Sequence, residues 1–187
     1  ITVDGPGRKI EHNGGPGDTL SINNAAQARA FVDACRYPPQ GNRGYAAPIV
    51  RASGYGAIDD YARHANDELL LIGQIEHVEA ARDVDAIAAV DGLDMLFIGP
   101  NDLAGSLGKL ERLEDPEVRE LIGELEQRIV AGGRWMGTIT GPGRDVATLS
   151  ESGYRFVAGP NDIALFANTL RDEANAWRAR SADFDTV

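Results

Sequence analysis

The chain has 187 residues, of which 43% are hydrophobic and 25% are charged, and its formal net charge is −11. This length and composition are those of one globular domain with a substantial core. The acidic balance argues against nucleic acid and against an anionic membrane surface, because both are bound by faces rich in Lys and Arg. No apolar stretch approaches the ~20 residues of a transmembrane helix, and no signal-peptide pattern opens the sequence. A single cysteine, Cys35, excludes an internal disulfide and favours a cytoplasmic location.

Residues 1–22 are rich in Gly and Pro, and this composition predicts an irregular or abbreviated front portion. Within it, only residues 1–3 and 19–22 resemble short strands. The dipeptide Glu11-His12 is the notable feature of this segment. From the residues alone, the simpler interpretation is an exposed dipeptide in a loop.

Hydrophobic periodicity predicts a series of helices further along the chain. Asn23 or Asn24 is the expected cap of the first one, and Asp115-Pro116 is a strong helix-start signal later on. The expected helices cover residues 25–35, 58–68, 78–90, 116–131, 146–152 and 163–180.

Apolar runs predict four strands, which alternate with these helices, at residues 69–75, 93–98, 134–139 and 154–158. Such alternation indicates an α/β protein with a parallel sheet, for which a (β/α)₈ TIM barrel is the natural architecture. A complete barrel typically needs ~250 residues, with about 200 as the lower limit. We therefore predict a single domain, residues 1–187, of TIM-barrel type and abbreviated on its N-terminal side. The two lysines, Lys9 and Lys109, lie outside the strands, which argues against Schiff-base chemistry.

Polar side chains follow two neighbouring strands of this sheet. Gln74 and Glu76 stand at the end of the first, and Asp102 closes the turn after the second. Because ligands bind beyond the carboxyl ends of parallel strands, both carboxylates are expected to face one pocket. Oxygen ligands of this kind suit Mg²⁺ or Mn²⁺ better than zinc. The sequence at 98–104 is echoed at 158–164, where we interpret Asp162 as a helix cap only.

These motifs together resemble the HpcH/HpaI aldolase family, the metal-dependent pyruvate aldolases that include 4-hydroxy-2-oxoheptanedioate and 2-dehydro-3-deoxyglucarate aldolases. The resemblance runs from about residue 24 to residue 176. Its carriers are the loop RYPPQGNRG at 36–44, Tyr61 with Ala65-Asn66-Asp67, Gln74-Ile75-Glu76, and FIGPNDL at 97–103.

The resemblance implies a barrel that assembles as a homo-oligomer, a hexamer or trimer of dimers with exchanged C-terminal helices. It implies Mg²⁺, Mn²⁺ or Co²⁺ held by Glu76 and Asp102, with Gln74 beside a bound pyruvate. The pyruvate carboxylate would be received by the turn formed of Gly99, Pro100, Asn101 and Asp102, since free N–H groups at a helix start favour an anion.

Family members also carry a strand that ends in Glu-His, whose histidine moves a proton, and a later strand that ends in an arginine. Glu11-His12 resembles the first of these, which makes His12 the candidate catalytic residue. No arginine lies between His12 and Asn24, and His77 stands where the family usually has a small residue.

The activity implied by the resemblance is that of a class II aldolase, which cleaves or forms 4-hydroxy-2-oxo acids to give pyruvate and an aldehyde. One alternative is a degenerate, non-catalytic barrel that binds metal and keto acid or only assembles with partners. Another is a citrate-lyase-β-like enzyme that acts on CoA thioesters, although the loop at 36–44 argues against it.

Overall fold

A computed structural model describes residues 21–182, and within them the chain forms a four-stranded parallel sheet in the order β1-β2-β3-β4. Each strand lies inside one of the four predicted apolar runs. Of the strand expected at 19–22, the structure describes residues 21 and 22, where Ser21 forms a parallel bridge with Gln74; the strand expected at 1–3 lies outside the described residues. The strands are β1 (Ile72–Ile75), β2 (Met95–Ile98), β3 (Trp135–Ile139) and β4 (Tyr154–Ala158).

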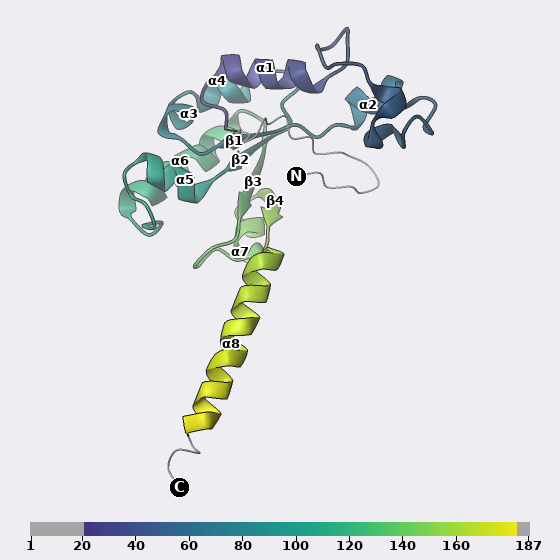
Figure 1. Ribbon diagram of the computed structural model, residues 1–187. Helices are drawn as coiled ribbons and strands as arrows, with labels where there is room; N and C mark the ends of the chain where they lie inside the picture. The colour runs from purple at the N-terminus through teal and green to yellow at the C-terminus, as the bar shows by residue number, and fades with distance from the viewer. Residues whose placement is uncertain (1–20, 183–187) are drawn as a thin grey trace.

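Helices alternate with these strands, so the described region consists of successive βα units around a parallel sheet, as predicted. Figure 1 shows α3 to α6 gathered on one side of the sheet, while α8 projects away from it. The α-helices are α1 (Ala25–Cys35), α2 (Tyr61–Glu68), α3 (Val78–Arg82), α4 (Val84–Ala88), α5 (Pro100–Ser106), α6 (Pro116–Ala131), α7 (Val146–Glu151) and α8 (Asp162–Ala182), with short 3₁₀ turns at Ala47–Ile49 and Arg51–Ser53.

Two helix predictions need correction. The helix expected over 78–90 is divided into α3 and α4 at Asp83, whose backbone leaves the helical conformation and whose Oδ2 accepts a hydrogen bond from the Ala25 N–H at 2.8 Å. The helix expected from residue 58 begins only at Tyr61. The chain before it still forms a turn, in which Gly54 and Tyr55 have φ values of 62° and 60°.

The predicted helix starts are confirmed in two other places. The Asn24 side chain accepts a hydrogen bond from the Gln27 N–H at 3.0 Å and caps α1. Asp115 caps α6 by accepting from the Glu117 N–H at 3.2 Å, with Pro116 at the first helical position. Each cap satisfies a backbone donor that the helix itself cannot.

The two faces of the sheet carry different side chains, because successive residues of a strand point to opposite faces. Ile75, Leu96 and Ile98 are fully buried in the main core, which the helices complete. On the other face, Gln74, Phe97, Gly137 and Phe156 lie side by side in register across the four strands. A Cβ on Gly137 would lie 2.9 Å from Phe97 Cδ2, so only glycine leaves room for the two aromatic rings beside it.

The loop at 36–44, which carries much of the resemblance, forms a second small core with α2. Arg43 stacks over the Tyr37 ring at 4.5 Å and donates to the Tyr61 hydroxyl at 3.3 Å. The Asn66 side chain accepts from the Tyr37 N–H and donates to the Tyr37 carbonyl, at 2.8 and 3.0 Å. Arg43 is therefore used in packing this loop.

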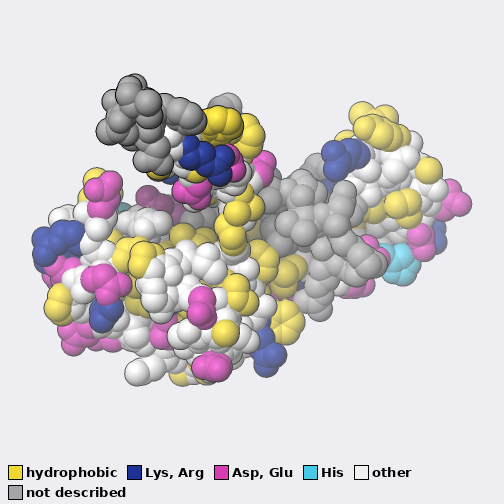
Figure 2. All heavy atoms as spheres, turned by 90° about the horizontal axis from the view of Figure 1, so that it is seen from below, with side chains coloured by type: hydrophobic (Ala, Val, Ile, Leu, Met, Phe, Trp, Pro, Cys, Tyr) yellow, Lys and Arg dark blue, Asp and Glu magenta, His cyan; other side chains and the backbone are white. Residues whose placement is uncertain are grey.

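The helix α8 exposes large apolar side chains. Ile163, Phe166, Leu170 and Trp177 are each more than half exposed, at 77%, 67%, 53% and 65%. Their spacing places them on one face of the helix. None of the helices within residues 21–182 combines the length and apolar composition that crossing a membrane requires. Acidic side chains are spread over the face seen in Figure 2 rather than gathered in one patch.

Candidate active site

The candidate site begins at the end of β1, where Gln74 and Glu76 point to the same face of the sheet. Glu76 follows the last residue of the strand and is only 7% exposed. Gln74 donates a short hydrogen bond from its amide Nε2 to Glu76 Oε2. A buried carboxylate needs such donors or cations around it. The amide of Gln74 therefore fixes the orientation of the Glu76 carboxylate.

The start of α5 lies directly against this carboxylate. The Gly99 N–H donates to the Ile75 carbonyl at 3.0 Å, which continues the pairing of β1 and β2 by one residue. A Cβ on Gly99 would lie 2.9 Å from Glu76 Cβ and 3.2 Å from Glu76 Oε2. Glycine is thus required for the turn after β2 to approach Glu76 this closely.

Asp102 belongs to the first turn of α5, with Pro100 at the first helical position and Gly99 as the N-cap. Asp102 is exposed, and it is not the capping residue. The backbone N–H groups of Asn101 and Asp102 fall in the first turn, where the helix offers them no acceptor. The turn therefore offers exposed donors and a carboxylate beside buried Glu76.

The cap role predicted for Asp162 is wrong. The residue that caps α8 is its neighbour Asn161, whose Oδ1 accepts from the Ala164 N–H at 2.7 Å. Asp162 is the first residue of the helix, and its own Oδ1 accepts from the Ile163 N–H at 2.9 Å. The turns at 98–104 and 158–164 thus differ. The first helix begins at Pro100, so Asp102 is its third residue, whereas the second begins at Asp162 itself.

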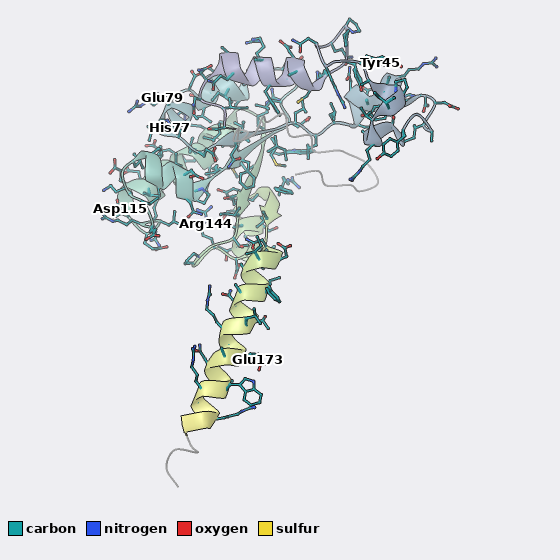
Figure 3. All side chains as sticks on the ribbon, in the orientation of Figure 1. Tyr45, His77, Glu79, Asp115, Arg144 and Glu173 are labelled. Carbon is teal, nitrogen blue, oxygen red and sulfur yellow. The ribbon has the colours of Figure 1, made fainter. Side chains whose placement is uncertain are left out.

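Of His12 and His77, the structure describes only His77. His12 lies outside the described residues. His77 caps α3, because its Nδ1 accepts from the Glu79 N–H at 3.2 Å, and Figure 3 shows both side chains at the start of that helix. The departure at His77 from the family pattern thus has a structural role.

The donor set fits a hard divalent cation. Within residues 21–182, no three His, Cys, Asp or Glu side chains gather into a ready-made metal cage. Mg²⁺ does not need one, since it is commonly held by one or two carboxylates, with water and substrate oxygens completing its shell. Glu76 and Asp102, which follow adjacent strands, can supply two such carboxylates. Their joint ligation of one ion stays a prediction.

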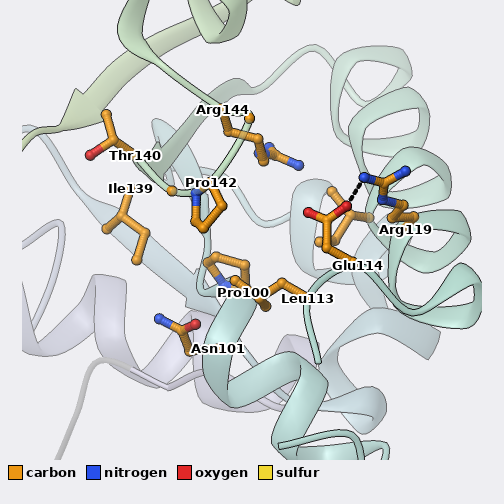
Figure 4. A pocket seen from close by; sticks show the side chains of 12 residues that line it. Pro100, Asn101, Leu113, Glu114, Arg119, Ile139, Thr140, Pro142 and Arg144 are labelled. Carbon is orange, nitrogen blue, oxygen red and sulfur yellow. Dashed lines mark hydrogen bonds and ion pairs between the residues drawn. The ribbon is translucent and has the colours of Figure 1, made fainter. Parts of the chain in front are cut away.

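Sequence reasoning missed a cavity of about 550 Å³ beside this turn. Its walls come from the start of α5, the segment before α6, α6 itself, the end of β3 and the turn after it (Figure 4). The signal that could have revealed it is Thr140-Gly141-Pro142-Gly143, a turn that directly follows a strand. The cavity is lined by Pro100, Asn101, Leu113, Glu114, Arg119, Ile122, Ile139, Thr140, Gly141, Pro142, Gly143 and Arg144.

The two arginines of this cavity each contact a partner, although the buried Nε of Arg144 meets no hydrogen-bond acceptor within residues 21–182. Arg119 forms an ion pair with Glu114, shown by the dashed line in Figure 4. Arg144 donates from Nη2 to the Tyr154 hydroxyl at 3.0 Å and to Glu126 Oε1 at 3.4 Å, and Tyr154 donates to the same Glu126 oxygen at 2.6 Å. Burial, followed by the hydrogen bond to Glu126, raises the pKa of Tyr154, so its hydroxyl stays protonated and remains a donor.

Comparison with known proteins places this architecture in context. The sequence model of the family described as HpcH/HpaI aldolase/citrate lyase matches residues 21–169. A hydroxypyruvate/pyruvate aldolase of Cupriavidus necator is 42% identical over 162 residues, which cover 87% of this chain and 60% of that relative. A 4-hydroxy-2-oxovalerate aldolase of Novosphingobium aromaticivorans is 40% identical over 161 residues, covering 86% of this chain and 61% of that relative.

A solved structure agrees with these sequence matches. The HpcH/HpaI aldolase/citrate lyase family protein from Burkholderia cenocepacia J2315 superposes with a TM-score of 0.75 at 31% identity, over 84% of this chain and 62% of that one. The chain thus spans about three fifths of the length of the relatives it matches. Because the family match extends over residues 21–169, the chain belongs to the HpcH/HpaI aldolase/citrate lyase family.

Proposed function

We propose that this chain carries the metal-binding part of a class II aldolase, which cleaves or forms 4-hydroxy-2-oxo acids and yields pyruvate and an aldehyde. The observation that carries the proposal is the close approach of Gly99 to the Gln74–Glu76 pair at the carboxyl ends of β1 and β2. Relatives with 40% identity or more are named hydroxypyruvate/pyruvate aldolase and 4-hydroxy-2-oxovalerate aldolase, which supports the same activity here.

In this proposal Glu76 and Asp102 hold Mg²⁺, Mn²⁺ or Co²⁺. When bound, such an ion supplies Lewis-acid stabilisation of the enolate of a keto acid. The role of Gln74 is to orient Glu76 through the hydrogen bond between them. Since Glu76 is buried, its carboxylate is held in one direction and loses little freedom when it acts as a ligand.

The remaining roles belong to the turn after β2 and to His12. The N–H groups of Asn101 and Asp102 lie in the first turn of α5 and are suited to receive the carboxylate of the keto acid. Pro100 has no N–H, and as the first helical residue it fixes the start of that turn. His12 is the proposed proton-transfer residue, on the resemblance of Glu11-His12 to the family motif.

The alternatives are a degenerate barrel without activity and a CoA-thioester lyase of the citrate-lyase-β type. The aldolase names of the relatives favour neither of them. A degenerate barrel would keep metal binding and lose turnover, whereas a CoA lyase would act on thioesters and leave 4-hydroxy-2-oxo acids intact. Both alternatives can thus be separated from the proposal by substrate and by chelation.

We also propose that the chain assembles as a homo-oligomer through α8. The support is the apolar face of this projecting helix, defined by Ile163, Phe166, Leu170 and Trp177, which is exposed in the single chain. We expect Phe166→Glu to reduce the assembly to monomers, as measured by light scattering after size exclusion. Asn168→Glu, which introduces the same side chain two residues away on a different face of α8, should preserve the oligomer. Retention of the oligomer by Phe166→Glu would refute α8 as the interface.

The aldolase proposal is tested by measuring pyruvate release from 4-hydroxy-2-oxo acids with Mg²⁺ and again after chelation. We expect activity to disappear with the chelator and to fall at least ~100-fold in Glu76→Gln, because even indirect partners of metal ligands contribute 10–100-fold. Glu79→Gln, the same change at an exposed position, serves as the matched control. Metal-independent release, or full activity of Glu76→Gln, would overturn the proposal.

A further inference from the structure

We infer that Thr138 of β3 is a positioning residue for the candidate site, because its hydroxyl fixes the peptide group from which α5 begins. The inference rests on the proposed function, since it concerns how the two proposed metal ligands are held relative to each other. Among residues 21–182, three polar or charged residues are buried, Ser53, Glu76 and Thr138, and Thr138 is fully buried. A buried hydroxyl needs a hydrogen-bond partner, and that partner indicates what the side chain does.

The partner of Thr138 is the last residue of β2. The Thr138 hydroxyl donates to the Ile98 carbonyl at 3.0 Å, whereas the backbone pairing of β2 with β3 ends one residue earlier. Further along β3, the Thr140 N–H donates to the Ala158 carbonyl of β4 at 3.0 Å, so it does not continue the pairing with β2. The hydroxyl of Thr138 thus takes the place of a backbone donor at the end of these two strands.

The peptide group that joins Ile98 to Gly99 is therefore held from both sides. Its N–H, which belongs to Gly99, donates to the Ile75 carbonyl of β1 at 3.0 Å. Its carbonyl, which belongs to Ile98, accepts from Thr138 of β3. The Gly99 carbonyl then accepts from the Leu103 N–H at 3.0 Å and opens α5. Because the peptide group is planar and both of its polar atoms are bonded, it cannot rotate without breaking a hydrogen bond.

The direction of this peptide group determines where the first turn of α5 lies relative to Glu76. Gly99 is so close to that carboxylate that an added Cβ would lie 3.2 Å from Glu76 Oε2. Asp102 belongs to the same first turn. A rotation of the peptide group would move Asp102 relative to Glu76, whereas a working site has to be held within ~0.5 Å of its productive geometry. Thr138 thus acts on the spacing of the two proposed ligands through the backbone of the turn.

The experiment measures Mn²⁺ affinity by electron paramagnetic resonance in Thr138→Val, which keeps the shape of the side chain and removes the hydroxyl. We expect the affinity to fall roughly three- to tenfold, the factor that one neutral hydrogen bond contributes. Thr138→Ser keeps the hydroxyl and should retain wild-type affinity. Thr169→Val, which removes a hydroxyl that donates to the Leu165 carbonyl in α8, is the matched control. Wild-type affinity in Thr138→Val, or an equal loss in Thr138→Ser, would overturn the inference.

A double variant separates positioning from a general loss of stability. Thr138→Val and Gly99→Ala both disturb the approach of the turn to Glu76. Together they should therefore weaken Mn²⁺ binding by less than the product of their separate effects, because neighbouring changes to one contact are not independent. Effects that multiply would mean that Thr138 supports stability alone, and they would reject the inference.

Amide hydrogen exchange separates failure of this inference from failure of the proposed function. Exchange of the Gly99 N–H reports on the peptide group itself and needs no metal. In Thr138→Val it should become roughly three- to tenfold faster relative to the N–H of Leu125, a buried residue of α6. A wild-type protein that binds no Mn²⁺ would refute the proposed function, and Gly99 exchange would then decide on Thr138 alone. Unchanged Gly99 exchange in Thr138→Val would reject the positioning role in either case.

Discussion

At the amino end of the sheet, Arg134 donates to the carbonyls of Ala88 and Val90 at 2.6 and 3.1 Å, so that a charged side chain closes the end of α4. At the carboxyl end, Glu76 is held by Gln74 beneath a turn in which Asp102 is exposed. The arginine satisfies backbone groups, whereas Glu76 and Asp102 are the proposed metal ligands. If the proposed site is correct, substitutions at the amino end should affect stability and those at the carboxyl end should affect metal binding.

A second arginine, Arg128 in α6, also has a structural role. Arg128, near the end of that helix, donates to Asp85 Oδ1 and Oδ2 at 3.0 and 2.8 Å and to the Ala81 carbonyl at 2.9 Å. One guanidinium thereby links α6 with α3 and α4. Planar, bidentate pairing of this kind cannot be replaced by lysine. We regard this group, with Arg134, as the main polar support for the helices behind the sheet.

The largest stability effect is expected at Arg134. Arg134→Met should lower the free energy of unfolding by about 2–3 kcal/mol, because two carbonyls at the end of α4 lose charged donors. Mn²⁺ affinity should not change, since the site is at the opposite end. Urea unfolding and Mn²⁺ titration measure the two quantities, and Arg155→Met, an exposed arginine on β4, is the control. A stable Arg134→Met protein with weakened Mn²⁺ binding would show that Arg134 supports metal binding rather than stability, which contradicts this account.

At Gly99 we expect a smaller effect, and we expect it on Mn²⁺ affinity rather than on stability. In Gly99→Ala the new methyl group would press on Glu76 and Gln74. We expect Mn²⁺ affinity to fall about tenfold, or ~1.4 kcal/mol, with less change in stability. Gly123→Ala in α6, where a Cβ meets no atom within 4 Å, should leave affinity unchanged and add roughly 0.5–1 kcal/mol of stability. Unaltered Mn²⁺ binding by Gly99→Ala would show that the close contact with Glu76 has no functional role.

The smallest effect concerns pH at the arginine-supported end. The hydrogen bond from Arg128 lowers the pKa of Asp85, so Asp85 contributes stability above its unfolded pKa and loses it as pH falls through the lower, folded pKa. The difference in urea midpoint between wild type and Asp85→Asn should thus be present at pH 7 and vanish in strong acid. In the Arg128→Met background the difference should be absent at every pH. A difference that persists there would exclude Arg128 as the cause.

The strands and most helices could be predicted because their signals are local. The apolar runs that became β1 to β4 lie between turn residues, and Asn24 and Asp115 cap helices through contacts within three residues. The division of the helix over 78–90 could not be predicted, since the Asp83 side chain binds the N–H of Ala25, 58 residues earlier.

The candidate site could be predicted only in part. Parallel order alone puts Glu76 and the turn at Gly99 at one edge of the sheet, and the register of β1 with β2 confirms their adjacency. The cavity could not be foreseen, because Pro100, Glu114 and Arg144 meet there from separate elements. Likewise, only the structure shows that His77 caps α3 and that Arg43 packs on Tyr37.

The most direct measurement is a Mn²⁺ titration followed by electron paramagnetic resonance on wild type, Glu76→Gln, Asp102→Asn and the double variant. If both carboxylates hold one ion, each single variant should weaken binding by about tenfold or more, and the double variant should abolish the bound signal. Wild-type affinity in Asp102→Asn, together with loss in Glu76→Gln, would show that the two carboxylates do not share an ion and would contradict the account.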